Sequence, residues 1–295
     1  MNWGEIFALS SAAVWALAVI MLRRSGETLP AFELNLFKNT FGFVLMIPTI
    51  LIFYGVALPD FSAAEILLAI ASGVLGIALA DTWYLKALNL MGASRTGIVA
   101  SLFSPFVILL STIFLGERMQ PGQWLGFFLV IAGVMLVTWR VNRSEVDSAD
   151  LKKGALYGVA SMFMMAIGIV MVKGLLETKP FLWTFELRMV GGVCGLLVFM
   201  LPRERWLRVK HNFLQPQPWG MIVGASFLAA YLALILWLAG YKLIDASLAS
   251  ALNETNGAFI VLLAWLMLGE SLNRRKLAGI SLTLTGVIIM ISMSL

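Results

Sequence analysis

Two stretches of this sequence are alike and together decide the fold. Residues 96–117 read TGIVASLFSPFVILLSTIFLGE, and residues 249–270 read ASALNETNGAFIVLLAWLMLGE. Each is a mostly apolar run of about 20 residues, the length that one helix needs to cross the hydrocarbon core of a membrane. Each ends in Leu-Gly-Glu, and glycine suits the residue just after the end of a helix. The pair predicts two membrane helices at equivalent places in a duplicated chain.

The composition agrees with a membrane protein. Of the 295 residues, 60% are hydrophobic and 13% are charged, whereas soluble domains have roughly 25% charged residues. One soluble core cannot hide so much apolar surface. Soluble enzymes, nucleic-acid binders and disordered proteins are therefore excluded, and the lipid bilayer is the expected surrounding. With one cysteine, Cys194, and one histidine, His211, which we place in a loop, no disulfide framework or metal site is expected.

Continuous apolar runs favour membrane helices over a barrel, whose strands alternate apolar and polar residues. Breaks at charged residues, proline and glycine divide the chain into ten spans. The predicted fold is all-α, with spans at 6–22, 31–54, 64–85, 96–115, 122–139, 154–173, 181–201, 217–241, 246–268 and 276–294.

The duplication covers the whole chain. An offset of 153 relates equivalent residues late in each half, and an offset of 150 relates those early in each half, so a three-residue slip lies between them. The matched pairs include Gly4/Gly154, Ser11/Ser161, Lys38/Arg188, Ala93/Ala246, Gly126/Gly279 and Gly133/Gly286. Five spans per half is an odd number, so we expect residues 1–143 and 144–295 to form an inverted repeat. Such repeats are typical of secondary transporters, with the substrate site between the halves.

Lysine and arginine predict the orientation. Fifteen of them fall in one set of loops and four in the alternate set. Because positive loops stay in the cytoplasm, we expect a multi-pass protein of the bacterial inner membrane with both termini outside the cytoplasm.

Four charges within predicted spans are costly in lipid and usually face a cavity or a partner. We expect Lys38 and Asp81 to share the cytoplasmic half of the membrane, and Arg188 and Glu254 the outer half. Each pair either neutralises itself within the bundle or provides a charge that contacts substrate or carries protons.

Further candidates for the substrate site are polar or aromatic. Asn253, Glu254 and Asn256 form a polar segment in the ninth span, whereas the matching first-half segment is apolar apart from Ser101. Tyr84 and Trp237 are repeat equivalents that either line the pathway or pack in lipid.

The sequence has no H-E-x-x-H, G-x-S-x-G or P-loop motif. No catalytic residue, cofactor or ATP-driven step is therefore expected, and we do not expect an enzyme.

The five-plus-five spans and the repeated Leu-Gly-Glu before Gly126/Gly133 and Gly279/Gly286 resemble the drug/metabolite transporter superfamily, specifically EamA-domain proteins. The resemblance covers the whole chain and implies export or exchange of amino acids, metabolites or toxic compounds. It also implies a kink at Pro105 in the fourth span, but not in the ninth, where Ala258 stands instead.

The sequence therefore predicts a secondary transporter that exports a small organic solute by alternating access, as a monomer or homodimer, with a proton as a possible coupling ion. Two alternatives stay open. One is a flippase for lipid-linked substrates, and the other is a membrane scaffold that transports nothing. A polar cavity bounded by the second, fourth, seventh and ninth spans would favour transport.

Overall fold

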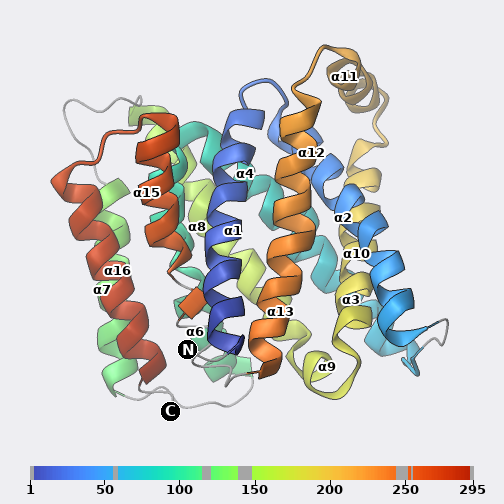
Figure 1. Cartoon of the computed structure of the whole chain (residues 1–295), viewed down its shortest axis with the longest axis horizontal. Helices are drawn as coiled ribbons and strands as arrows, with labels where there is room; N and C mark the ends of the chain where they lie inside the picture. Colours follow the sequence, from blue (N-terminus) through green and yellow to red (C-terminus); the bar gives the residue numbers. More distant parts are fainter. Residues whose placement is uncertain are drawn as a thin grey trace.

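The computed structural model describes residues 3–55, 59–114, 121–138, 148–243, 252–253 and 255–292, which form a bundle of helices (Figure 1). Its named elements are α1 (Trp3–Ser25), α2 (Ala31–Tyr54), α3 (Ala63–Gly73), the π-helix η1 (Val74–Ala80), α4 (Asp81–Met91), α5 (Ala93–Ala100), α6 (Phe103–Phe114), α7 (Pro121–Thr138), α8 (Ser148–Met171), α9 (Lys173–Thr178), α10 (Phe181–Met200), α11 (Arg203–Leu214), α12 (Trp219–Phe227), the π-helix η2 (Leu228–Leu232), α13 (Ala233–Leu243), α15 (Asn256–Leu268) and α16 (Arg274–Ser292). Within the described ranges there is no β-strand.

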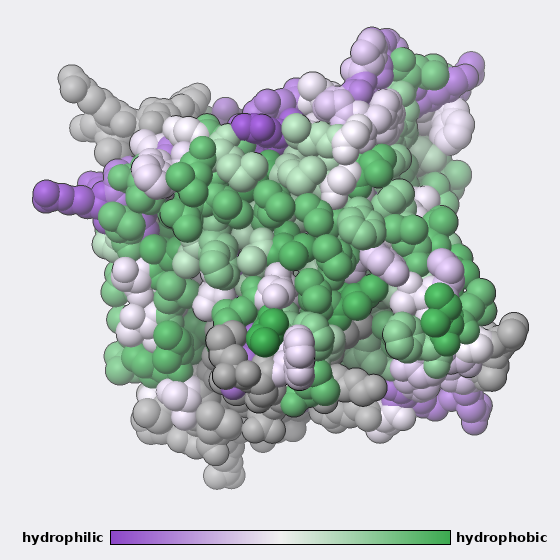
Figure 2. Space-filling model, viewed as in Figure 1, coloured by the Kyte–Doolittle hydropathy of each residue, from purple (hydrophilic) through white to green (hydrophobic). Residues whose placement is uncertain are grey.

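Length and composition give six candidate membrane spans among these residues. They are Trp3–Ser25, Ala31–Tyr54, Ala63–Met91, Ala149–Met171, Phe181–Met200 and Trp219–Trp237. Shorter apolar helices cover Trp124–Leu136 and Asn256–Leu268. On the face that Figure 2 shows, apolar residues fill the middle of the bundle and hydrophilic residues gather along its upper edge and at its lower right. Because lipid hides such an apolar surface from water, the fold is that of a multi-pass membrane protein.

The expected fourth span is two helices rather than one. α5 ends at Ala100 and α6 begins at Phe103. Pro105 has no N–H to donate to the carbonyl four residues earlier, that of Ser101, so the helix cannot continue through this point. In the ninth span Thr255 is also a turn residue and α15 begins at Asn256, although no proline is present there. The two spans that we quoted first are therefore both interrupted near their repeat-equivalent positions.

The third span is longer than expected and contains a π-helix. α3, η1 and α4 run without interruption from Ala63 to Met91, so Asp81 lies ten residues from the end of the span instead of the expected four. The eighth span contains the second π-helix, η2, between α12 and α13. With the offset of 153, η2 falls within the positions equivalent to η1. Single π-turns in α-helices are rare and frequently lie at functional sites.

Glycines bring α7 and α16 into backbone contact at one side of the bundle (Figure 1). A Cβ atom added to Gly133 would lie 2.7 Å from the carbonyl oxygen of Gly279, and one added to Gly286 would lie 2.6 Å from that of Gly126. The sequence numbers rise along α7 as they fall along α16, so the two helices are antiparallel. Gly133 and Gly286 are repeat equivalents, and so are Gly126 and Gly279. The same contact is therefore made twice, with the roles of the two halves exchanged.

Two buried serines make a second exchanged contact. The Ser11 hydroxyl on α1 donates to the carbonyl of Ala233 at 2.9 Å, and the Ser161 hydroxyl on α8 donates to that of Ala80 at 2.7 Å. Ser11 and Ser161 are repeat equivalents, and so are Ala80 and Ala233. Each half therefore supplies a hydroxyl to the end of the other half's π-helix.

One end of the bundle carries a basic helix. α11 lies across one end in Figure 1, and its exposed basic residues include Arg203, Arg205 and Arg208. His211 is part of this helix and not of a loop. α1 begins and α16 ends at the opposite end of the bundle (Figure 1).

Candidate functional site

A polar stripe on α2 forms one wall of the candidate site. Asn35, Lys38 and Asn39 are three or four residues apart, so they share one helix face, and all three are buried. The Lys38 Nζ atom lies 2.6 Å from Asp81 Oδ2 on α4, and the Asn39 amide lies 3.5 Å from the same oxygen. The predicted Lys38–Asp81 pair is therefore present as a buried ion pair.

The η1 segment fixes the position of Asp81. The Asn35 side-chain amide donates to the carbonyl of Ile77 at 2.8 Å and to the Thr82 hydroxyl at 3.0 Å. The Thr82 hydroxyl donates to the carbonyl of Ala78 at 2.6 Å. Side chains from α2 and α4 thus bind the carbonyls of the π-helix directly before Asp81, which holds its carboxylate against Lys38.

Arg188 reaches this site from α10. Gly73 lies against the Arg188 backbone, where any side chain on residue 73 would overlap it, so α3 and α10 approach closely. The guanidinium extends past Gly76 and interacts electrostatically with Asp81. We expected Arg188 to share its depth with Glu254 and not with Asp81, so this electrostatic interaction was not predicted. Glu254, the expected partner of Arg188, lies outside the described residues.

The other polar candidates lie where the interrupted spans cross. Ser101 is buried at the break between α5 and α6, and its hydroxyl is 3.7 Å from the position that a Cβ atom on Gly257 would occupy. Asn253 and Asn256 flank the start of α15 and are half-buried. Among the described residues, no hydrogen bond or ion pair joins this second group to the Lys38–Asp81 pair.

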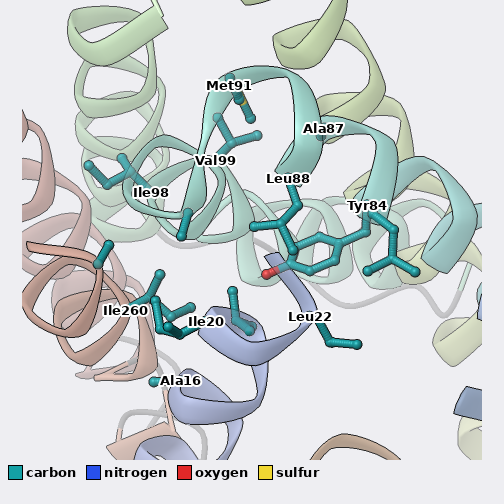
Figure 3. Close-up of a cluster of buried hydrophobic side chains, with 14 of the residues drawn as sticks. Ala16, Ile20, Leu22, Tyr84, Ala87, Leu88, Met91, Ile98, Val99 and Ile260 are labelled. Atoms are coloured by element: carbon teal, nitrogen blue, oxygen red, sulfur yellow. The ribbon is translucent and has the colours of Figure 1, made fainter. Parts of the chain in front are cut away.

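The two aromatic candidates pack in different places. Tyr84 is buried in the core and its ring centroid lies 6.3 Å from that of Trp15. Its hydroxyl points away from α4 toward α1 in Figure 3, and within the described part of the chain it has no hydrogen-bond partner. The Trp237 ring lies 6.2 Å from that of Phe181, next to the start of α10. Trp237 therefore packs beside an aromatic side chain, whereas the Tyr84 hydroxyl is buried without a hydrogen-bond partner among the described residues.

The Leu-Gly-Glu motif at the end of α15 makes a contact between helices that the sequence did not predict. The Glu270 carboxylate accepts hydrogen bonds from the N–H groups of Ala93 at 2.7 Å and Ser94 at 3.1 Å, and lies 3.3 Å from the Lys276 ammonium. Burial favours a raised pKa for Glu270. The Ser94 hydroxyl, the Lys276 charge and the two N–H groups outweigh this effect, and the pKa is lowered. The ionised carboxylate thus caps α5 of the first half.

Sequence reasoning also missed Asn35, Asn39 and Thr82. The signal for the first two was present, since two asparagines flank Lys38 at helical spacing in an apolar span. For Thr82 there was no such signal, because a threonine in a helix often bonds to its own backbone. Among the described residues no cluster of histidine, cysteine, aspartate and glutamate could hold a metal ion.

The fold and the site together define a multi-pass membrane protein with a buried group of charges. The model of the EamA-like transporter family matches residues 2–139 and again residues 152–292. This chain belongs to that family and is a membrane transporter.

Named relatives are also transporters. An uncharacterized transporter of Archaeoglobus fulgidus is 20% identical over 97% of both chains. The rat UDP-N-acetylglucosamine transporter is 29% identical over 50% of this chain and 47% of its own, and the pseudopaline exporter CntI of Pseudomonas aeruginosa is 30% identical over 45% and 46%. A crystal structure with 17% identity matches 97% of this chain and 95% of its own with a TM-score of 0.66, which shows a shared fold.

Proposed function

We propose that this protein is a secondary transporter that exports a small organic solute, such as a metabolite, an amino acid or a drug-like compound, by alternating access between two inverted halves. Ten spans, five in residues 1–143 and five in 144–295, would form the pathway. No catalysis is involved. The name of the exporter CntI supports the direction.

The observation that carries this proposal is the exchange of equivalent contacts between the halves. Gly126 and Gly279, and Ser11 and Ser161, occupy interchangeable places in contacts between the halves. Equivalent residues exchange in this way when a two-fold axis relates two units. Since α7 and α16 are antiparallel, that axis runs across them, as in an inverted repeat whose substrate site lies between the halves.

Two carboxylates are candidates for proton coupling, Asp81 and Glu254. Asp81 already has Lys38 as a partner, and a proton that neutralised Asp81 would release the ammonium. The test is transport into proteoliposomes, with the unknown solute first identified by comparing metabolites inside and outside cells with and without the protein. If Asp81→Asn and Glu254→Gln both leave transport and its pH dependence unchanged, the coupling proposal is wrong.

We place the protein in the bacterial inner membrane with both termini outside the cytoplasm. The basic helix α11 and the start of α16 at Arg274 lie toward the same end of the bundle (Figure 1), which supports this orientation. A reporter fused after Leu295 tests it, because activity in the cytoplasm would reverse the orientation. One chain holds both halves, so a monomer is sufficient for transport.

Flipping of a lipid-linked substrate is the second candidate. An apolar cavity of about 290 Å³ between α6 and α8 is lined by Leu110, Phe114, Ile167, Val170 and Met171. Its lining suits an acyl or prenyl chain better than a polar solute. Transport of a water-soluble solute by the purified protein would decide against this function, and the buried charges count against a passive scaffold.

A further inference from the structure

We propose that the transported substrate carries an anionic group, a carboxylate or a phosphate, which binds beside Arg188 and supplies a negative charge that the buried cluster lacks. This inference rests on the proposed transport function and specifies its substrate class. The cluster consists of Lys38, Asp81 and Arg188.

The charges of this cluster do not balance. Lys38 and Arg188 are two cations. Among the described residues, Lys38 forms an ion pair with Asp81, whereas Arg188 interacts with the same carboxylate only electrostatically, without an ion pair. Lys38 lies 2.6 Å from Asp81 and its side chain is 6% exposed. With two cations and one carboxylate, the cluster has a net charge of +1. Because a buried charge without a partner costs several kcal/mol, the cluster favours a bound anion.

The internal repeat shows where the missing carboxylate would be. Lys38 and Arg188 are repeat equivalents, and the exchanged serine bonds match Ala80 with Ala233. The residue after Ala80 is Asp81, whereas the residue after Ala233 is Leu234. The second half therefore has a cation, Arg188, at the position of Lys38 and a leucine at the position of Asp81.

Arg188 has unused hydrogen-bonding capacity. Its Nε atom is buried and has no hydrogen-bond partner in the described part of the chain. A guanidinium presents planar donors that match a carboxylate or a phosphate. Glu186 is close in sequence, but two residues turn a helix by about 200°, which places it on the other side of α10.

The experiment adds back the missing carboxylate. Purified protein in a neutral detergent is heated in the presence of anions and of uncharged counterparts: UDP-N-acetylglucosamine against uridine, acetate against acetamide, and inorganic phosphate against glycerol. We expect at least one anion to raise the unfolding temperature and its counterpart to have no effect. Leu234→Asp is expected to weaken the apparent affinity for that anion about tenfold or more, since it removes a charge-assisted interaction.

Matched variants separate charge from shape. Leu234→Asn changes the same position without a charge and is expected to keep the affinity of the wild type within about twofold. Arg188→Gln is expected to lose binding as Leu234→Asp does, whereas Asp81→Asn removes the competing carboxylate and is expected to tighten binding. If Leu234→Asp does not fold, the proposal is tested by the other two variants, because Arg188→Gln is expected to weaken the affinity for the anion and Asp81→Asn to strengthen it. If the cluster had only a structural role, both Arg188→Gln and Asp81→Asn would weaken binding of the anion.

Several outcomes would overturn the proposal: no anion stabilises the wild type, aspartate and asparagine at position 234 act alike, or Asp81→Asn weakens binding. A further arm replaces the soluble anions with phosphatidylglycerol or phosphatidylcholine in the detergent micelles. Stabilisation by the anionic lipid alone would keep the anion site and assign it to a headgroup. Transport of neutral solutes only would leave the transport function standing and refute the anionic substrate.

Discussion

The hydroxyl of Ser161 donates a hydrogen bond to the carbonyl of Ala80, across the two halves of the chain and at the end of a π-helix. Ser11 does the same for Ala233. These two bonds relate the halves more directly than any match in the sequence, and they lead to the first prediction.

Replacement of either serine by alanine is expected to destabilise the protein by about 0.5–1 kcal/mol, the net value of one hydrogen bond between membrane helices. The two single variants should be equal, because the contacts are equivalent. Denaturant unfolding in detergent measures the effect, and Ser10→Ala, one residue from Ser11, is the control. Unequal losses would show that the two contacts are not equivalent.

Glu270 predicts a dependence of stability on pH. Its pKa is lowered in the folded protein, so the ionised carboxylate stabilises the fold above the ordinary carboxyl pKa of about 4.3. This stabilisation disappears as the pH falls through the lower, folded value. The difference in unfolding temperature between the wild type and Glu270→Gln should thus be largest near neutral pH and vanish at acid pH. A difference that stays constant with pH would contradict the capping role.

The Lys38–Asp81 pair predicts a non-additive double substitution. Asp81→Asn alone should destabilise the protein by about 3–5 kcal/mol, because it leaves the buried Lys38 ammonium without its partner. Lys38→Met alone should cost less, because Arg188 still interacts with Asp81. The double variant should be less destabilised than the sum of the two. Unfolding of the three variants in detergent forms the double-mutant cycle, and additive losses would show that the two charges are independent.

The glycine contact between α7 and α16 predicts sensitivity to one methyl group. Gly133→Ala would place its Cβ atom 2.7 Å from the Gly279 carbonyl oxygen, which cannot move without its helix. We expect a loss of about 1–3 kcal/mol from this overpacking. Gly220→Ala is the matched control, since a Cβ atom there meets nothing within 4 Å. Equal stability of the two variants would show that the helices separate without cost.

Part of the candidate site could be predicted from the sequence because a charged side chain is costly in lipid and is therefore conspicuous in an apolar span. Lys38 and Asp81 stand out in apolar spans, and their pairing follows from the cost of a lone charge. Arg188 was recognised as a buried charge, but its electrostatic interaction with Asp81 was not predicted. An arginine side chain is long and reaches a depth other than that of its own Cα atom, and the helix of Asp81 extends further than the apolar run indicated.

The contact of Glu270 with α5 could not be predicted from the sequence, for a different reason. Its motif was visible at once, but a residue after a helix normally caps its own helix, and nothing in the sequence identifies a partner 176 residues earlier. Similarly, the break in the fourth span was predicted only as a kink at Pro105. Its position at Ser101 follows from the carbonyl that the proline leaves unbonded.

The sequence by itself determined that this chain lies in a membrane, that it is duplicated and that it carries charges within its spans, because the transfer of apolar and charged groups into lipid depends on composition and length. The tertiary structure alone decided which helices exchange contacts between the halves and which charges meet. Those relationships depend on how close two backbones approach at Gly73 or Gly133, and such distances arise only when the helices pack.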